Sequence, residues 1–293
     1  MPAVGFVYPN GDKVSFEDVK KGKVDIELIG MSLPTLIEMS RERDPNRKPS
    51  TTELLVGSCE AYLKRTKDYY IDPQDRAFSL AGTLHHLKLE QGQDNRHLKE
   101  EALEEFDITG IADLYDKETK LLIDYKNTGS FKCSKLLGMS FEYVDDPNGE
   151  RYKTSGKWGK KGSLKKVKQW YRDESKADFG DWGWQVNWYR YLLEKQGYEV
   201  YKMYIQVTLR DGGLQAARNT GLDKNIYLIE VPKYDDEVLE NKFISAKKDL
   251  TYALETGNLP SKCTIEQTWD GRKCQSYCEV RHLCPYNNGS ING

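Results

Sequence analysis

A chain of 293 residues is long enough to bury a substantial hydrophobic core, as one large domain or two small ones. Charged residues make up 31% of the chain and the formal net charge is −2, so the whole-chain charge predicts no polyanionic partner. No apolar run approaches the length of a membrane span, and the first residues lack the pattern of a signal peptide. We therefore expect a cytoplasmic protein with no membrane partner. Six cysteines in such a chain favour metal binding or simple burial over disulfide bonds.

The N-terminal part of the sequence predicts a short lead-in and then a helix. Residues 1–49 are expected to form a β-rich or irregular lead-in with one short helix near its end. Ser50 and Glu53 have the spacing of a capping box, which predicts a helix over 50–70. Apolar residues recur on this helix at helical spacing, so Cys59 is expected to face inward.

A second helix is expected at 77–91. His86 and Glu90 lie one turn apart on one face of it, where both side chains could reach a common ligand. The buried side of this helix is expected to carry three leucines, Leu80, Leu84 and Leu87.

Two predicted strands, 107–115 and 121–126, are joined by a short loop. Because side chains alternate along a strand, Asp124 and Lys126 share one face of the second strand. Pairing of the strands would bring Asp113 of the first strand beside Asp124, and two neighbouring carboxylates favour a bound cation. The alternative is a weak surface ion pair, which Asp and Lys two residues apart often form on an edge strand.

The segment 151–172 contains nine Lys or Arg residues and no acid, with aromatic residues among them. Cations that meet phosphates and rings that stack on unpaired bases are typical of a nucleic-acid-binding surface. The alternative is a solvated loop, because Gly156, Gly159 and Gly162 interrupt regular structure. The residues predicted to bind nucleic acid are Lys157, Lys160, Lys161, Lys165, Lys166, Trp158 and Trp170.

The last third of the chain predicts regular elements followed by a cysteine-rich tail. The regular elements are a helix at 184–195, strands at 199–210 and 226–231, and a helix at 235–254. A [4Fe–4S] cluster needs four thiolates, of which Cys274, Cys278 and Cys284 would supply three. The fourth is either Cys59 or Cys263. Zinc bound by the four cysteines of the tail is the main alternative.

Five motifs, taken in chain order, resemble those of the PD-(D/E)xK nucleases in their RecB-like branch. The resemblance covers about residues 50–285. The RecB-like branch includes members with iron–sulfur clusters, such as the CRISPR-associated adaptation nucleases. The motifs are 82–86 with its histidine, 110–113, 123–126, the Q-x-x-x-Y pattern at 185–189, and the cysteines that end at Cys284 and Pro285. One departure is that Glu60 follows Cys59, where the branch usually has a proline.

The resemblance implies an α/β fold with a PD-(D/E)xK restriction-endonuclease-like core, in which helices flank a mixed central sheet beside a cysteine-rich iron–sulfur region. It implies a nuclease domain at 50–285, with a basic insertion at about 137–180, a cluster-binding region at 258–285 and a tail at 286–293. The ligands implied for Mg²⁺ or Mn²⁺ are His86, Asp113, Asp124 and the main-chain carbonyl of Tyr125. The ligands implied for a [4Fe–4S] cluster are Cys59, Cys274, Cys278 and Cys284.

The resemblance further implies that Lys126 orients the attacking water and that Gln185 and Tyr189 position the site or the strand that passes it. The expected activity is that of a metal-dependent DNA nuclease, more specifically an exonuclease acting on single strands or ends. The expected partners are DNA and proteins of recombination, repair or CRISPR adaptation. The alternative is a non-catalytic nucleic-acid-binding protein that a zinc or iron–sulfur site holds together.

Overall fold

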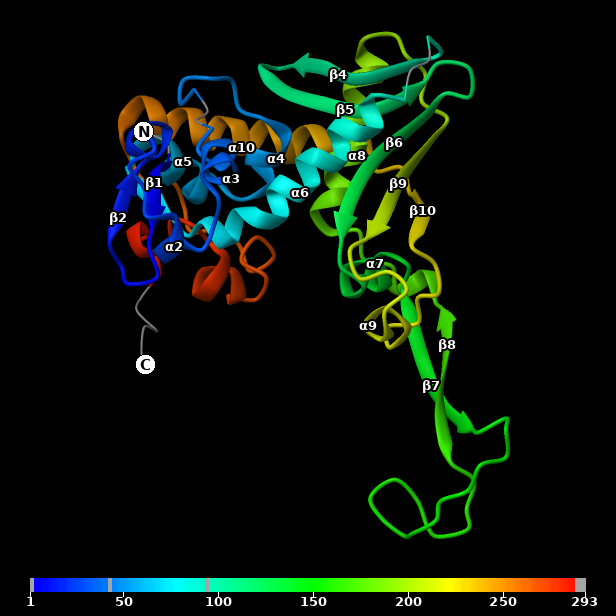
Figure 1. The fold of residues 1–293 in the computed structure, drawn as a ribbon. Helices are drawn as coiled ribbons and strands as arrows, with labels where there is room; N and C mark the ends of the chain where they lie inside the picture. The colour runs from blue at the N-terminus through cyan, green and yellow to red at the C-terminus, as the bar shows by residue number, and fades with distance from the viewer. Residues whose placement is uncertain (1–2, 42–43, 93–94, 288–293) are drawn as a thin grey trace. The chain divides into compact units, whose positions relative to one another are not determined.

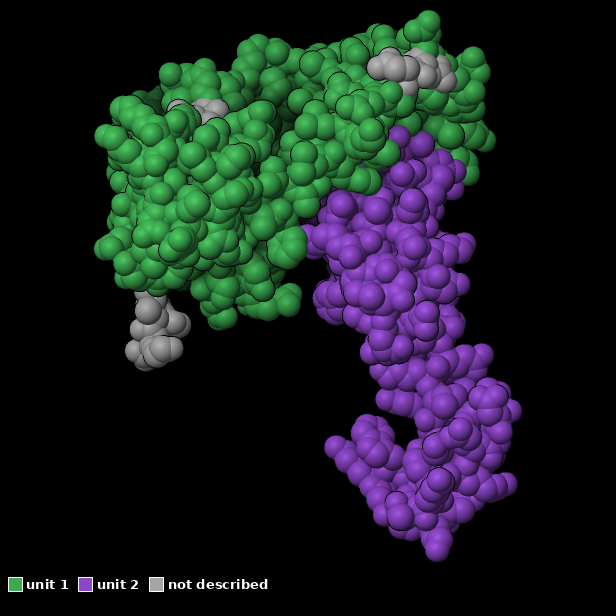
Figure 2. Space-filling view, viewed as in Figure 1, with its two compact units in different colours: residues 1–122, 184–203, 232–293 green, residues 123–183, 204–231 purple. Residues whose placement is uncertain are grey.

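The computed structural model describes residues 3–41, 44–92 and 95–287, so most of the expected tail at 286–293 lies outside the described residues. The chain forms two compact units (Figure 2). Unit 1 comprises Met1–Leu122, Trp184–Met203 and Pro232–Gly293, and unit 2 comprises Ile123–Gly183 and Tyr204–Val231. The architecture is mixed α/β, as the sequence predicts. Over the three described ranges, no helix is both long and apolar enough to cross a membrane.

Strands of the described residues form three sheets, with the orders β2-β1-β3, β10-β9-β6-β5-β4 and β7-β8 (Figure 1). The strand bounds are β1 Ala3–Val7, β2 Lys13–Ser15, β3 Tyr69–Ile71, β4 His97–Glu105, β5 Ile108–Asp116, β6 Leu121–Thr128, β7 Met139–Asp145, β8 Lys166–Arg172, β9 Lys202–Leu209 and β10 Ile226–Val231. The two strands predicted to carry the acidic residues are therefore β5 and β6, and they are neighbours in the sheet order, as expected.

The helices begin and end at the following residues: α1 Phe16–Lys20, α2 Ile26–Ile29, α3 Leu33–Met39, α4 Thr51–Leu55, α5 Ser58–Thr66, α6 Pro73–Glu90, α7 Ser130–Leu136, α8 Gly180–Lys195, α9 Gln215–Arg218 and α10 Asp236–Thr256. The N-terminal segment is a folded part of unit 1, because β1 pairs with β2 and also runs parallel to β3.

The helix predicted over 50–70 is in fact two helices. Its start is as predicted, because the Ser50 side chain accepts from the backbone N–H of Glu53 in a capping box. The helix breaks at Gly57, whose φ of +105° is open to glycine and costly for other residues. The expectation also fails at its end, where residues 69–71 form β3 instead.

Helix α6 contains the predicted helix 77–91 but begins earlier, with Asp72 as its N-cap and Pro73 in its first turn. The expected burial is wrong for Leu84 and Leu87, which are 58% and 50% exposed, whereas Leu80 is half-buried. The side of the helix that faces β5 is the side that carries His86. The side that carries Leu84 and Leu87 is therefore exposed to solvent.

Helices α8 and α10 have the core and capping residues that the sequence predicts, although α8 begins at Gly180, before its predicted start at 184. On α8, Trp188 and Leu192 are buried core residues, as their spacing predicts. Helix α10 has Asp235 as its N-cap and ends at Gly257, which has φ +73°.

Unit 2 is more regular than the sequence predicts for 130–180. Ser130 begins α7, and the Asp211 carboxylate accepts hydrogen bonds from both its backbone N–H and its hydroxyl. Strands β7 and β8 pair along their whole length, from Met139 with Arg172 to Asp145 with Lys166. The tip at 146–165 contains no named strand or helix, and the three glycines predicted to interrupt structure lie there.

Candidate functional site

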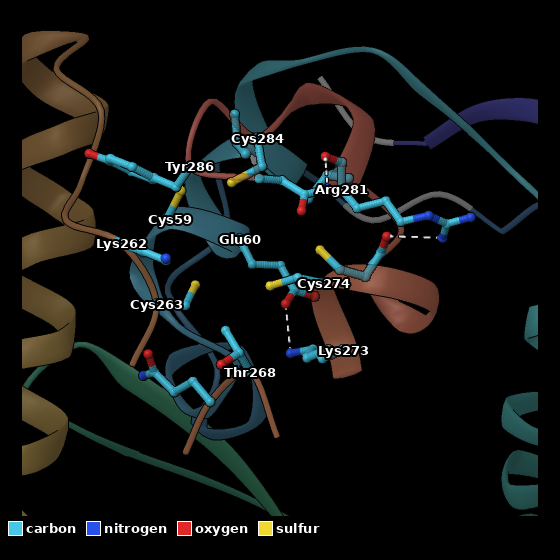
Figure 3. A pocket seen from close by; sticks show the side chains of 15 residues that line it. Cys59, Glu60, Lys262, Cys263, Thr268, Lys273, Cys274, Arg281, Cys284 and Tyr286 are labelled. Carbon is cyan, nitrogen blue, oxygen red and sulfur yellow. Dashed lines mark hydrogen bonds and ion pairs between the residues drawn. The ribbon is translucent and has the colours of Figure 1, made fainter. Parts of the chain in front are cut away.

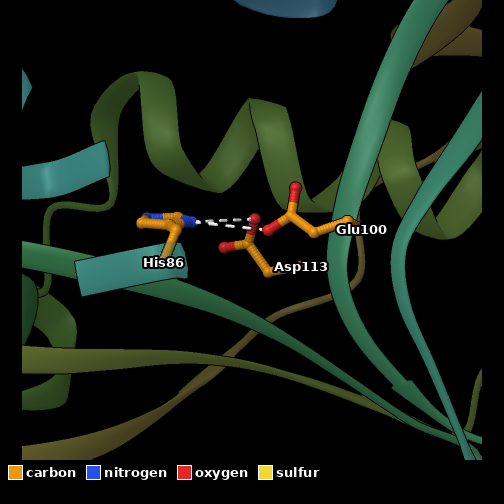
Figure 4. A group of neighbouring side chains, drawn as sticks. All are labelled: His86, Glu100 and Asp113. Atoms are coloured by element: carbon orange, nitrogen blue, oxygen red, sulfur yellow. Dashed lines mark ion pairs between the residues drawn. The ribbon is translucent and has the colours of Figure 1, made fainter. Parts of the chain in front are cut away.

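Three potential metal ligands gather in unit 1 from three different elements. His86 lies on α6, Glu100 on β4 and Asp113 on β5, and their ligand atoms all lie within 4.8 Å of one another (Figure 4). The His86 Nδ1 atom is 3.3 Å from Asp113 Oδ1 and 3.9 Å from Glu100 Oε1. No other group of three or more His, Cys, Asp or Glu ligands as tight as this occurs among the described residues.

The spacing of these atoms suits a small divalent cation. Neighbouring ligands of an octahedral ion with bonds of about 2.1 Å lie about 3 Å apart, and opposite ligands lie about 4.2 Å apart. The separations of 3.3 and 3.9 Å fall between those two values. The donor set of one imidazole and two carboxylates suits Mn²⁺ or Mg²⁺, with the imidazole favouring Mn²⁺. Asp113 is the most buried of the three, with 8% of its side chain exposed.

The register of the β4–β5 hairpin explains why Glu100 and Asp113 meet. Lys99 pairs with Leu114 and Glu101 pairs with Ala112, so Glu100 lies opposite Asp113. The backbone at Glu100 has a φ of +48°, in the left-handed region that side chains other than glycine and asparagine rarely adopt. Such local strain recurs at ligand-binding positions, where it re-aims a side chain.

Glu100 is the functional candidate that the sequence analysis missed. Its place depends on the register of the β4–β5 hairpin, which the two-residue turn at Phe106 and Asp107 fixes, and Phe106 gives no turn signal in the sequence. Glu90, the ligand suggested one turn after His86, is not a member of the group.

The second cluster of predicted residues lies on β6 in unit 2. Lys126 Nζ is 2.7 Å from Asp124 Oδ2, so the two side chains share a face, as the alternation of the strand predicts. Asp124 is 1% exposed and Lys126 is 14% exposed, so this is not the exposed surface pair of the alternative interpretation. Tyr125 lies between them on the same strand. Asp113 belongs to unit 1 and Asp124 to unit 2, so their predicted proximity stays a prediction.

An aromatic ring beside this ion pair was also missed. The Lys126 ammonium lies 5.7 Å from the centre of the Trp182 ring, and Lys132 Nζ lies 4.9 Å from it. Burial lowers the pKa of Lys132 from its ordinary value. Trp182 thus brings two cations to one place near the buried carboxylate of Asp124.

The predicted residues of α8 pack against the strand that carries Asp113. Gln185 Nε2 lies 2.8 Å from Tyr189 Oη in a buried hydrogen bond. A Cβ atom at Gly110 would come within 2.7 Å of the Tyr189 ring, so only glycine permits this approach. Gln185 and Tyr189 therefore support β5 three residues before Asp113, and this contact explains the glycine of the 110–113 motif.

Five of the six cysteines line one pocket in unit 1, and they come from α5 and from the tail. These cysteines are Cys59, Cys263, Cys274, Cys278 and Cys284. Figure 3 shows sulfur atoms from both segments around this pocket. A Cβ atom at Gly57 would lie 2.8 Å from Cys263 Sγ, so the break between α4 and α5 makes room for that cysteine. Both candidates for a fourth ligand, Cys59 and Cys263, are therefore beside the three predicted ones.

The thiols of this pocket influence one another. A hydrogen bond from Cys59 lowers the pKa of Cys263 to about 6, and the same contact raises the pKa of Cys59. Burial raises the pKa of Cys278 to about 12. All six cysteines are free thiols.

Buried ion pairs fasten the tail to α5 next to the cysteines. Glu60 Oε2 lies 2.6 Å from Lys273 Nζ, and both residues are less than a tenth exposed. Lys64 lies 2.8 Å from Glu60 and 3.0 Å from Glu279. Glu60 follows Cys59 and Lys273 precedes Cys274, so the residue that replaces the expected proline joins the two cysteine-bearing segments.

The residues predicted to bind nucleic acid lie in unit 2, on β8 and on the tip that joins it to β7. Trp158 is 70% exposed at the tip, whereas Trp170 is half-buried on β8. Lys165 pairs with Glu150, and Lys166 lies 2.7 Å from Asp145. Lys157, Lys160 and Lys161 are exposed positions of the tip.

Comparisons with known proteins leave the family open. No family model matches the chain, and no curated protein matches its sequence. A solved structure described as "Crystal structure of SSO0001" is 14% identical over 87% of this chain and 95% of its own, with a TM-score of 0.39. A likeness at that TM-score carries no conclusion about fold or activity.

Proposed function

We propose that the protein is a metal-dependent deoxyribonuclease with a PD-(D/E)xK-type core and a structural [4Fe–4S] cluster. The observation that carries the proposal is the group of His86, Glu100 and Asp113, which three separate elements bring within 4.8 Å. The positive φ of Glu100 supports the proposal, because strained backbone often occurs at ligand-binding positions. The Asp124–Lys126 pair on β6 supplies the remaining residue types that phosphodiester hydrolysis requires.

A divalent cation at this group would supply an activated water and neutralise charge on the scissile phosphate. The residues that would hold it are His86, Glu100 and Asp113 in unit 1, with Asp124 and the carbonyl of Tyr125 as the further ligands expected from the motif. Lys126 would orient the attacking water and stabilise the negative charge that develops on the phosphate. Gln185 and Tyr189 would hold β5, and with it Asp113, in position.

The cysteine pocket supports an iron–sulfur cluster better than zinc. Thiolates around a tetrahedral zinc ion with Zn–S bonds of about 2.3 Å lie about 3.8 Å apart. In the described part of the chain, no three cysteine sulfur atoms lie within 4.8 Å of one another. A four-iron cluster holds its thiolates farther apart, because each binds a different iron atom. Cys274, Cys278 and Cys284 with Cys59 remain the proposed ligands.

The test is cleavage of labelled single-stranded and duplex DNA with Mg²⁺ or Mn²⁺ by the anaerobically purified protein. Asp113→Asn and Asp124→Asn should each abolish turnover, because each removes a negative charge from a site that must bind the cation. Asp116 is a poor control, because its buried carboxylate is hydrogen-bonded to Arg96 and to Thr119. Asp249→Asn, on the exposed side of α10, is the matched control and should cleave like the wild type.

Two outcomes would contradict the proposal. If Asp124→Asn cleaves DNA as fast as the wild type, with contaminating nuclease excluded, the assignment of the site is wrong. If the wild type binds DNA and cleaves no substrate with either metal, the alternative of a non-catalytic nucleic-acid-binding protein stands in its place.

A further inference from the structure

The β7–β8 hairpin has one face that is rich in aromatic and cationic side chains. Residues that pair across an antiparallel hairpin project from the same face, and the next pair along projects from the other. Four successive pairs on one face are Met139 with Arg172, Phe141 with Trp170, Tyr143 with Lys168 and Asp145 with Lys166. We call these eight residues the ring face. The opposite face carries Ser140 with Tyr171, Glu142 with Gln169 and Val144 with Val167.

The rings of this face lie against one another and remain open to solvent. The centroid of the Phe141 ring is 4.9 Å from that of Trp170 and 5.6 Å from that of Tyr143. Phe141 is 41% exposed and Tyr143 is 53% exposed. The Lys168 ammonium lies 4.1 Å from the centre of the Phe141 ring, so a cation accompanies the exposed rings.

The base of the ring face is held in place by its own unit. A Cβ atom at Gly221 would come within 2.7 Å of the Trp170 ring and 2.8 Å of the Met139 side chain. Trp170 therefore packs between the Gly221 backbone and the Phe141 ring. A supported stack of this kind loses little conformational freedom when a further ring is added to it.

Charge gives the hairpin a preference among partners. From residue 139 to residue 172 there are nine Lys or Arg residues and four Asp or Glu residues, whereas the whole chain carries a net charge of −2. The basic residues continue from β8 into the tip at 146–165. A partner that fits both features must offer many negative charges and flat rings that are not already stacked.

We propose that the ring face of the β7–β8 hairpin is a stacking platform for single-stranded DNA. Unpaired bases stack on Phe141 and Tyr143, while Lys168 and the lysines of the tip meet the phosphates. A duplex keeps the faces of its bases covered, so it can use the cations but not the rings. The choice of DNA rests on the proposed function, and the geometry of the platform does not.

The experiment measures binding of a short labelled oligothymidylate to the full-length protein by fluorescence anisotropy, with EDTA present so that cleavage plays no part. Phe141→Ala combined with Tyr143→Ala should raise the dissociation constant by about fivefold to a hundredfold for each base that loses its stacking partner. The dependence of binding on salt should not change, because no cation is removed.

Two matched variants define the controls. Tyr171→Ala removes an exposed tyrosine from the opposite face of the same hairpin and should leave binding unchanged. Neutralising Lys157, Lys160 and Lys161 should instead flatten the log–log salt dependence by about 0.7 for each phosphate that no longer meets a cation. Trp170 is left unchanged, since its packing on Gly221 supports the hairpin. Thermal unfolding of each variant shows whether it is folded.

Three outcomes would overturn the platform. One is equal loss of affinity in Tyr171→Ala and in the double variant. Another is equal loss for duplex and single strand, and the third is that the double variant loses binding to anionic lipid vesicles while its DNA binding is intact. Cleavage does not enter the measurement, so a platform confirmed here survives failure of the nuclease proposal. Likewise, cleavage that requires Asp124 survives failure of the platform.

Discussion

At the scale of single residues, the sequence motifs predicted the Asp124–Lys126 pair but could not predict Glu100. The spacing of Asp124 and Lys126 was sufficient to place them on one face, because alternation along a strand is local geometry. Glu100 depends on the register of β4, which follows from the turn at Phe106 and Asp107. Both turn residues have positive φ, and Phe106 carries none of the turn signals that glycine or asparagine would give.

Glu100 offers a sharp test of the metal site. Glu100→Gln keeps the size of the side chain and removes its charge, so it should weaken binding of Mn²⁺. We expect the Mn²⁺ concentration for half-maximal cleavage to rise by at least about tenfold, the lower range for loss of a residue that supports a metal ligand. Glu101→Gln, at the next position along β4, should behave like the wild type. Equal metal dependence in the two variants would exclude Glu100 as a ligand.

Lys126 should act on turnover and not on the binding of metal. Lys126→Met keeps the aliphatic stem and removes the charge that lies 2.7 Å from Asp124. We expect kcat to fall by about a hundredfold, as for loss of one group that stabilises a transition state. The Mn²⁺ affinity, measured by calorimetry, should not fall. Lys132→Met is the matched control, because Lys132 contacts the same Trp182 ring. A large loss of turnover there would point to Trp182 as the important group.

At the scale of elements, helix starts were predicted with unequal success: those at Ser50 and Asp235 were as expected, whereas α6 and α8 both begin before their predicted starts. The capping box at Ser50 and the N-cap at Asp235 were visible, because each depends on a few adjacent residues. The break at Gly57 was not visible, since it serves a contact with Cys263, some two hundred positions later in the chain. The exposed leucines of α6 were mispredicted for a similar reason. Helical spacing shows that a stripe exists, but the partner of the helix decides which face is covered.

Helix α4 is tied to α5 by a buried ion pair with a pH-dependent contribution to stability. Arg65 donates to both carboxylate oxygens of Glu53, at 2.8 and 2.6 Å, and both residues are less than a tenth exposed. Burial alone would raise the pKa of Glu53, but the hydrogen bonds and charge of Arg65 lower it overall. A carboxyl group whose pKa is lower in the folded protein stabilises the fold above its unfolded pKa, and that contribution is lost as the pH falls through the folded value.

Glu53→Gln should therefore destabilise the protein at neutral pH by about 3–5 kcal/mol, because it leaves the Arg65 guanidinium buried without its counter-charge. The difference in Tm between the variant and the wild type should be largest at pH values above the ordinary Glu pKa of about 4.3. Below that pH it should narrow as the wild-type carboxylate takes up a proton. The exposed pair of Lys120 and Glu199 provides the control, because Glu199→Gln should change Tm little at any pH. A gap that widens on acidification would contradict this account.

At the scale of the whole molecule, the cysteine pocket joins residues from distant parts of the chain. The segment 258–285 contains few regular elements, and it is held to α5 by the pair of Glu60 with Lys273 and by the contact of Cys263 with Gly57. The sequence predicted that the tail cysteines and Cys59 would meet, but only on the strength of a resemblance. The part played by Glu60 could not be predicted, because a carboxylate after Cys59 departs from that pattern.

If a cluster occupies this pocket, then loss of the cluster should leave the segment 258–285 less ordered. We expect the anaerobically purified protein to be brown and to contain iron and sulfide, and Cys59→Ala, Cys274→Ala, Cys278→Ala and Cys284→Ala should each lose the colour. Cys263→Ala should keep it, because Cys263 lines the pocket but is not one of the four proposed ligands. Cys133→Ala is the control, since Cys133 is buried in α7 and does not line the pocket.

Limited proteolysis measures how well the segment 258–285 is ordered with and without the cluster. In variants without a cluster, the segment 258–285 should be cut faster than in the wild type, because ordering an irregular segment depends on the free energy that its ligand contributes. The rest of unit 1 should resist, since α8 and α10 bury their own core. If the anaerobically purified protein contains zinc and no iron, then the tail holds a tetrahedral zinc site and not a cluster. Colour that survives Cys59→Ala but not Cys263→Ala would instead change only the fourth ligand, and the tail would still be fastened at the same pocket.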